Sequence, residues 1–142
     1  MKEGICTILG ATGSIVAGLF GGWDTSLLTL IVFMSIDYIT GVAAAAAKHS
    51  PKSVSGGLSS SAGFHGLAKK GVILLLVLVG ARLDIMLGFS YIRDGVCIAY
   101  IINELISITE NAGLLGVPLP PALVNAIEVL QKKSEKNDRK KE

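Results

Sequence analysis

The sequence has few charged residues, few aromatic residues and only two cysteines. Charged residues make up 17% of the 142 residues, against about 25% in an ordinary soluble domain. Cys6 and Cys97 lie far apart in apolar segments, which excludes a disulfide framework and favours two small buried thiols. The sequence contains no recognisable Ser/His/Asp arrangement, no histidines with metal-ligand spacing and no GxxxxGK phosphate loop. These absences predict a protein that is not an enzyme and that holds neither a cofactor nor a metal.

Long apolar runs dominate the chain instead. Hydrophobic residues make up 51% of it, and its mean hydropathy is +0.61. We expect an all-α integral membrane protein with three to four short transmembrane helices, at about residues 4–22, 27–47, 71–89 and 92–115. Leu123, Ile127 and Leu130 have helical spacing and predict an amphipathic helix at about 121–133 on the membrane surface. Residues 1–133 then form one transmembrane domain, and residues 134–142 form a charged flexible tail.

The basic residues predict the orientation of these helices. They gather in the polar loop 48–70 and in the tail, which the positive-inside rule places in the cytoplasm. Four spans put both termini in the cytoplasm, whereas three spans leave the N-terminus outside if the first segment does not cross. No cleavable signal peptide is expected, because Glu3 offsets the early base Lys2. We expect anionic lipid headgroups, and not nucleic acid, to meet the loop lysines, which are Lys48, Lys52, Lys69 and Lys70.

The first apolar segment is rich in small residues. Gly10, Ser14, Gly18 and Gly22 recur at every fourth position, a spacing that lets helix backbones approach closely in lipid. One interpretation is a face for oligomerisation. The alternatives are a helix packed within its own protomer and a helix that lies at the membrane surface.

Ionisable residues interrupt the second and third apolar segments. Asp37 lies near the middle of the second segment, where a carboxylate is costly and is a functional candidate. It shares a helix face with Gly41, so this face is expected to pack on a neighbouring helix; a buried structural anchor is the alternative. Arg82 and Asp84 are candidates for an ion pair in the third segment. Two residues apart, they point to different sides of the helix, so Arg82 would extend toward the membrane surface or pair with Asp37 or Glu104.

The last apolar segment carries a polar stripe. On a helix, its polar side chains fall within an arc of roughly 120°. The stripe must be hidden from lipid, either against other helices or around water. A pore lining and a helix-packing seam are therefore the two interpretations of its members, which are Tyr100, Asn103, Glu104, Ser107, Glu110 and Asn111.

The order of these residues resembles that of a known family. The resemblance covers roughly residues 25–130 and is densest in NELISITENAGLLG. It rests on Asp37, Ser59 to Gly66 with Lys69 and Lys70, Asp84, Arg93, Tyr100-Ile101, Glu104, Ser107-Ile108, Glu110-Asn111, Leu115-Gly116 and Pro118. The chain resembles phage holins of the toxin secretion/phage lysis type, which include clostridial toxin-release proteins.

The resemblance implies a homo-oligomer in the bacterial inner membrane. Such proteins open lesions that release an endolysin, for phage lysis, or a protein toxin. The expected partners are therefore further copies of the chain, membrane lipid, the released endolysin or toxin, and an antiholin. An antiholin-like regulator and a small ion channel are the alternative functions.

Overall fold

The chain folds into five α-helices. We describe a computed structural model that covers residues 1–49, 51–52 and 54–139. The helices are α1 (Lys2–Leu19), α2 (Thr25–Ala46), α3 (Ser60–Leu87), α4 (Ile92–Leu114) and α5 (Pro121–Arg139). The described residues contain no strand, and the predicted all-α class is confirmed.

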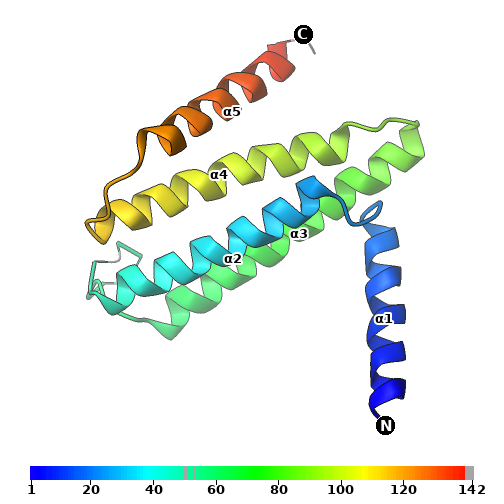
Figure 1. The fold of residues 1–142 in the computed structure, drawn as a ribbon, viewed down its shortest axis with the longest axis horizontal. Coiled ribbons are helices and arrows are strands. Elements are labelled where there is room, and N and C mark those ends of the chain that lie inside the picture. Colours follow the sequence, from blue (N-terminus) through cyan, green and yellow to red (C-terminus); the bar gives the residue numbers. More distant parts are fainter. Residues whose placement is uncertain (50, 53, 140–142) are drawn as a thin grey trace.

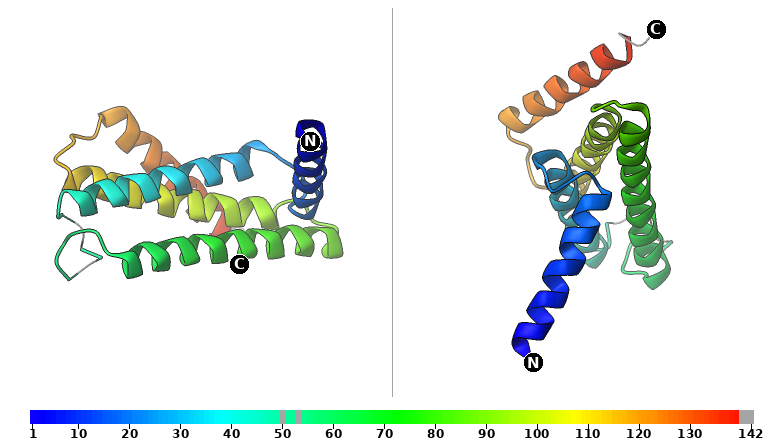
Figure 2. Two further views of the ribbon diagram at one scale, coloured as in Figure 1. Left: turned by 90° about the horizontal axis from the view of Figure 1, so that it is seen from below. Right: turned by 90° about the vertical axis from the view of Figure 1, so that its right-hand side faces the viewer.

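Three of the helices form a lengthwise bundle. α2, α3 and α4 run alongside one another, and α4 makes its most extensive contacts with α2 (Figure 1). α1 leaves the bundle crosswise at the end where α3 turns into α4, and α5 folds back over α4. Figure 2 shows that α1 and α5 leave the bundle on different sides. The bundle is therefore the part of the molecule that can hold a buried site.

The bundle core is made of apolar side chains from all three helices. Leu30 of α2, Val77 of α3 and Cys97 of α4 have no exposed surface. Partly buried side chains of α5, Ile127 and Leu130, pack against the outside of this core. The core cluster consists of Leu27, Leu30, Met34, Ile73, Val77, Cys97, Ile101 and Leu105.

Short polar side chains fix where the bundle helices begin. Asp24 caps α2 by accepting a hydrogen bond from the Leu27 N–H at 3.0 Å, and Ser59 caps α3 by accepting one from the Ala62 N–H at 3.4 Å. α3 ends at Gly88, whose φ of 71° suits a residue without a side chain. These caps satisfy backbone N–H groups that the first helical turn leaves unpaired.

Two predicted boundaries are wrong. The loop predicted for residues 48–70 ends at Ser59, and α3 starts eleven residues earlier than the predicted span at 71. The Ser59 cap outweighs the glycines that suggested a flexible connection. The tail predicted from residue 134 also begins too early, since α5 continues to Arg139. Lysine, glutamate and arginine favour helix, and Glu135 and Arg139 lie 3.9 Å apart at i,i+4. Residues 140–142 of that tail lie outside the described residues.

Within the described part of the chain, α2 alone is long and apolar enough to cross a membrane. Its most apolar stretch has a mean hydropathy of 1.9, and 28% of that stretch is buried. The other predicted spans do not meet the same criterion. α1 is rich in glycine and alanine, and α3 and α4 carry charges, which are Lys69, Lys70, Arg82 and Asp84 in α3 and Arg93, Asp94, Glu104 and Glu110 in α4.

Gly80 allows α3 and α4 to cross closely, which yields a testable prediction. A Cβ at this position would lie 3.1 Å from Cα and 3.4 Å from N of Arg93, and these backbone atoms cannot move aside as a flexible side chain can. We expect Gly80→Val to lower the free energy of unfolding by about 1 to 3 kcal/mol, measured by thermal unfolding in detergent. Gly71→Val, on the same helix where a Cβ meets open space, is the control. Equal effects of the two substitutions would contradict close crossing at Gly80.

Candidate functional site: a buried ion cluster across three helices

A lysine from α3 bridges two carboxylates inside the bundle. Lys70 Nζ lies 2.7 Å from Asp37 Oδ2 on α2 and 2.5 Å from Glu104 Oε2 on α4. The side chains of Lys70, Asp37 and Glu104 are 12%, 9% and 4% exposed. Each bundle helix thus contributes one charged group to a single buried ion cluster.

Neutral polar groups complete the hydrogen bonding of Asp37. Asn111 Nδ2 donates to Asp37 Oδ1 at 3.1 Å and to Thr40 Oγ1 at 3.0 Å. Thr40 Oγ1 donates in turn to the Asp37 backbone carbonyl at 3.1 Å. The cluster therefore fixes the register of α2 against α4 as well as that of α3.

The charges of the cluster do not balance. Two carboxylates and one ammonium leave a formal charge of −1 if all three groups are ionised. Lys52 of the loop before α3 lies near enough for its charge to act on Asp37. Burying such a cluster adds little net stability, but removing one partner leaves an uncompensated charge and is strongly destabilising. The cluster thus ties the three helices of the bundle to one another.

The structure divides the predicted polar stripe of α4 into two edges. Glu104 and Asn111 are buried and face α2 and α3, whereas Asn103 and Glu110 are exposed. Tyr100 and Ser107 lie between the two edges and are half-buried. The packing-seam interpretation therefore describes the inner edge, and the outer edge has no helix of the bundle against it.

Sequence reasoning missed the role of Lys70. Contact of Lys70 with lipid headgroups was the prediction, and it is wrong for this residue because its ammonium is buried between Asp37 and Glu104. The signal was present: Lys70 precedes the core residues Ile73 and Val77 by three and seven positions, so it shares their face once α3 begins at Ser60. Lys48, Lys52 and Lys69 are exposed, and their contact with headgroups stays a prediction.

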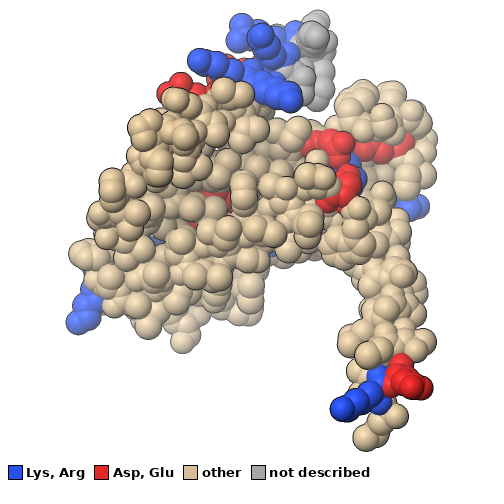
Figure 3. All heavy atoms as spheres, viewed as in Figure 1, with Lys and Arg blue, Asp and Glu red and all other residues tan. Residues whose placement is uncertain are grey.

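A second charged cluster lies at the end of the bundle where α2 and α4 begin. Arg93 of α4 contacts Asp24 through Nη1 at 2.5 Å and Nη2 at 2.9 Å, and its Nη2 donates to the Gly22 carbonyl at 3.2 Å. Asp94 lies 3.7 Å from the same guanidinium. Figure 3 shows the exposed acids of this end beside a surface that is otherwise mostly uncharged. Arg93 thus ties the connection between α1 and α2 to the start of α4.

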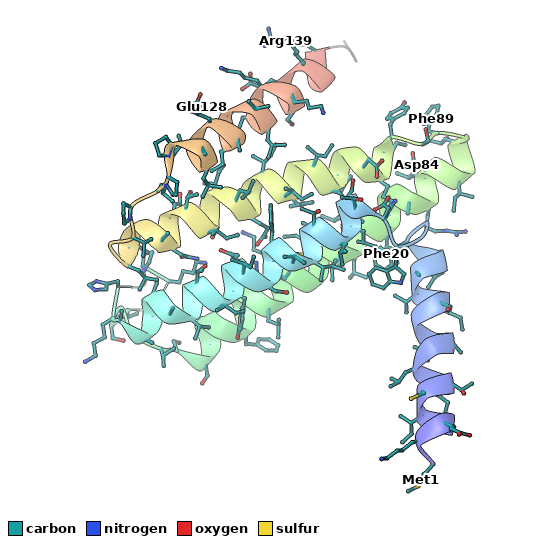
Figure 4. The ribbon with its side chains drawn as sticks, viewed as in Figure 1. Met1, Phe20, Asp84, Phe89, Glu128 and Arg139 are labelled. Atoms are coloured by element: carbon teal, nitrogen blue, oxygen red, sulfur yellow. The ribbon has the colours of Figure 1, made fainter. Side chains whose placement is uncertain are left out.

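The predicted candidates Arg82 and Asp84 do not act as a pair. Asp84 accepts hydrogen bonds from the backbone N–H groups of Ile92 at 2.9 Å and Arg93 at 3.0 Å. It therefore fastens the turn between α3 and α4, beside Phe89 (Figure 4). Arg82 is exposed, and among the described residues it has no ion-pair partner, neither Asp84 nor Asp37 nor Glu104. Arg82 and Asp84 do not pair with each other because they are two residues apart on α3, so their side chains point to different sides of the helix.

The predicted small-residue positions have different surroundings. On α1, a Cβ added to Gly10 or Gly18 would meet nothing within 4 Å, and Ser14 is exposed. Gly22 follows the end of α1 with a φ of +102°. Gly41 does pack within the protomer, because a Cβ there would lie 3.6 Å from Asn111 Nδ2. The described fold therefore leaves the small-residue face of α1 uncovered and uses Gly41 to bring α4 onto α2.

The Asp24–Arg93 contact predicts how stability depends on pH. Burial alone would raise the pKa of Asp24, but hydrogen bonds from Arg93 and the Leu27 N–H outweigh it and hold the pKa below its ordinary value of 3.8. The resulting stability is present above pH 3.8 and is lost as the pH falls through the lowered value. We expect Asp24→Asn, which keeps a helix cap, to unfold at a lower temperature than the wild type at pH 7. This difference should narrow below pH 3.8, and a difference that does not change with pH would contradict the ion pair.

The chain is similar to proteins of Clostridium and Listeria species and of a Bacillus phage. The family model described as "Bacteriophage holin family" matches residues 14–132. An "uncharacterized 14.9 kDa protein in nagH 3'region" of Clostridium perfringens is 41% identical over 94% of each chain. An uncharacterized protein of Listeria monocytogenes is 39% identical over 90% of this chain and 87% of its own.

The name of one similar protein states a function. A "probable holin" of Bacillus phage phi105 is 30% identical, over 86% of this chain and 88% of its own length. No solved structure matches the chain. Because the family model covers most of the chain, including every helix of the ion cluster, the chain belongs to the bacteriophage holin family.

Proposed function

We propose that this protein is a holin that assembles in the bacterial cytoplasmic membrane and opens pores or lesions. An endolysin, or a protein toxin, would pass through them. Membership of the holin family makes the protein a non-enzymatic one. The observation that carries the proposal is the division of α4 into a buried edge, which holds the protomer together, and an exposed polar edge.

In this proposal α2, α3 and α4 cross the membrane. Asp37 and Glu104 each lie twelve residues after the start of their helix, or about 18 Å along it. The ion cluster then lies well inside a hydrocarbon layer about 30 Å thick. The Arg93 cluster lies at the outer surface, and the loop lysines Lys48 and Lys52 lie at the cytoplasmic surface. The exposed apolar side chains of the bundle, such as Ile39 and Leu75, face lipid.

The orientation of α1 decides between three and four crossings. In the structure α1 does not run beside the other helices, and this arrangement supports three crossings with the N-terminus outside. A fourth crossing, with both termini in the cytoplasm, requires α1 to swing about Gly21 and Gly22. Both glycines have positive φ values, of 79° and 102°, so the connection is built from residues that tolerate such a change.

The exposed edge of α4 favours association of several copies of the protomer. Asn103 lies near the middle of α4, where an exposed carboxamide in hydrocarbon is costly. Glu110 lies closer to the cytoplasmic end on the same edge. Neighbouring copies can hydrogen-bond these groups to one another, or several copies can enclose them around water. Either arrangement produces the homo-oligomer that a membrane lesion needs.

Expression in a bacterium tests the proposal. The chain is induced alone and together with a cytoplasmic endolysin that has no export signal. We expect loss of membrane potential in both cultures and rapid lysis only in the second. The chain would be an antiholin-like regulator if it causes no loss of potential on its own and delays the lysis caused by a known holin. Loss of potential without release of the endolysin would identify a small ion channel, and either result would contradict the proposed function.

A further inference from the structure

An apolar hollow lies between α2 and α3 on the surface of the bundle. Its volume is about 300 Å³, and every residue of its lining belongs to α2 or α3. The hollow exists because α2 packs mainly on α4 and touches α3 little. Its lining is largely aliphatic, and Ile39 and Leu67 in it are exposed. Lys70 also lines the hollow, but its ammonium is held by Asp37 and Glu104. The hollow is therefore an apolar groove that opens outward.

α1 has no polar side with which to lie flat on a membrane. A helix in that position needs a charged side opposite its apolar side. The charged residues of α1 are Lys2 and Glu3 in its first turn, and residues 4–19 carry no charge. α1 also does not meet the criterion for a membrane span that α2 meets. It therefore suits a helix that crosses the membrane with one side packed against the rest of the protein.

One side of α1 already contacts the bundle. Ala17 is buried, and Phe20 packs against the bundle core. On a helix, Gly13, Gly10 and Cys6 continue the line of Ala17 toward the N-terminus, within an arc of roughly 60°. Bulky exposed side chains lie on the opposite side of α1, and these are Ile8, Ile15 and Leu19. Extending the present contact along α1 would thus place small residues against the bundle and bulky ones toward lipid.

The connection between α1 and α2 permits such an extension. Figures 1 and 2 show α1 pointing away from α4, on the side of the bundle that α2 and α3 form. Turning α1 at Gly21 and Gly22, whose positive φ values other residues rarely adopt, would lay it antiparallel to α2. Cys6 precedes Gly22 by sixteen residues, and Ile39 follows it by seventeen. Because both helices rise by about 1.5 Å per residue, Cys6 would then lie at the depth of Ile39 in the hollow.

We propose that α1 docks lengthwise in the hollow between α2 and α3, as the fourth transmembrane helix of its own protomer. The inference rests on the membrane location in the proposed function. The small side of α1 lets its backbone approach both helices closely, and the contact supplies dispersion interactions that an empty hollow forfeits. Docking moves Lys2 and Glu3 to the cytoplasmic surface and leaves Trp23 at the outer surface, where tryptophan is favoured. The protomer thus has a docked form and the extended form described above.

Disulfide formation by the native Cys6 tests the docking in isolated membranes of the expressing bacterium. Cys97→Ser removes the other native cysteine, and Ile39→Cys or Leu67→Cys supplies a partner in the hollow. We expect oxidation to link either new cysteine to Cys6 within one chain, which gives a monomer on a non-reducing gel and a linked peptide in mass spectrometry. Ile36→Cys, exposed on α2 outside the hollow and three residues before Ile39, should give no such link. Links between chains only would show that α1 docks on a second copy and would overturn the inference.

A pair of glycine variants tests whether the small side of α1 makes the contact. Gly10→Leu should abolish the link between Cys6 and Ile39→Cys, because a bulky side chain would hold α1 away from the hollow. Gly4→Leu, about 120° around the helix from Gly10, should keep the link. A Cβ at either glycine meets nothing within 4 Å in the extended form, so neither substitution disturbs that form.

Three results of these experiments would overturn the inference. They are the absence of an intrachain link, equal linking of Ile36→Cys and Ile39→Cys, and unchanged linking in Gly10→Leu. The cross-linking does not require lysis, so it is separate from the test of the proposed function. A chain that forms the link but does not release an endolysin would contradict the proposed function alone, whereas a chain that lyses cells without the link would contradict the docking alone.

Discussion

Lys70→Met is expected to destabilise the bundle by about 3 to 5 kcal/mol, the usual cost of removing one partner from a buried ion pair. The substitution keeps an unbranched side chain of similar length but leaves Asp37 and Glu104 without their shared ammonium. Both carboxylates are almost fully buried, so water cannot replace the lost partner. Thermal unfolding in detergent, followed by circular dichroism, measures the change.

A charge-free cluster provides the control for this prediction. Combining Lys70→Met with Asp37→Asn and Glu104→Gln removes all three charges while keeping the side-chain sizes. We expect this triple variant to recover most of the stability lost by Lys70→Met, because isosteric neutral groups need no counter-charge. If the triple variant is no more stable than the single one, the ion cluster does not hold the three helices together.

The second large effect is expected on lysis and not on stability. Replacing the exposed edge of α4, by Asn103→Ala with Glu110→Gln, should leave folding and membrane insertion unchanged, because neither side chain is buried in the protomer. Each lost interhelical hydrogen bond removes about 0.6 to 2 kcal/mol, so association should weaken about threefold to thirtyfold for each bond lost. The measurement is the onset of lysis with a co-expressed endolysin at equal protein levels, and we expect it to be strongly delayed or abolished.

A matched pair on α5 controls for the chemistry of the substitutions. Asn125→Ala with Glu128→Gln makes the same two changes at exposed positions of α5, and lysis should begin at the normal time. Delay by both pairs would point to a general effect of lost polarity. Normal lysis by the α4 pair would rule out a role for the exposed edge.

Much of the fold could be predicted from periodicity and composition. Apolar runs located the helices, and an isolated carboxylate at Asp37 correctly required a neighbouring helix. The polar stripe identified Glu104, which pairs with Lys70 of α3, and Asn111, which contacts α2. Gly41 was correctly expected to lie at a helix contact, since a small residue beside a buried charge allows close approach.

Other features depend on tertiary contacts that a single sequence does not show. The partner of Asp37 and Glu104 was missed because Lys70 follows a Ser/Gly-rich stretch that reads as a loop, although Ser59 caps a helix there. The arc of the polar stripe could not reveal which half the other helices cover. The crosswise position of α1 likewise depends on the Gly21–Gly22 connection and on Arg93, not on the apolar character of α1 itself.

The central claim is that the exposed edge of α4 joins copies of this protein inside the membrane while the ion cluster stays within each protomer. Disulfide cross-linking in isolated membranes tests it most directly. With Cys6→Ser, the remaining Cys97 is fully buried in α4, and it should yield monomers only. With Cys6→Ser, Cys97→Ser and Asn103→Cys, six residues further along α4, oxidation should yield covalent dimers, the largest product that one cysteine per chain can form. Monomers from Asn103→Cys, or recovery of the chain in the soluble fraction without detergent, would contradict the claim.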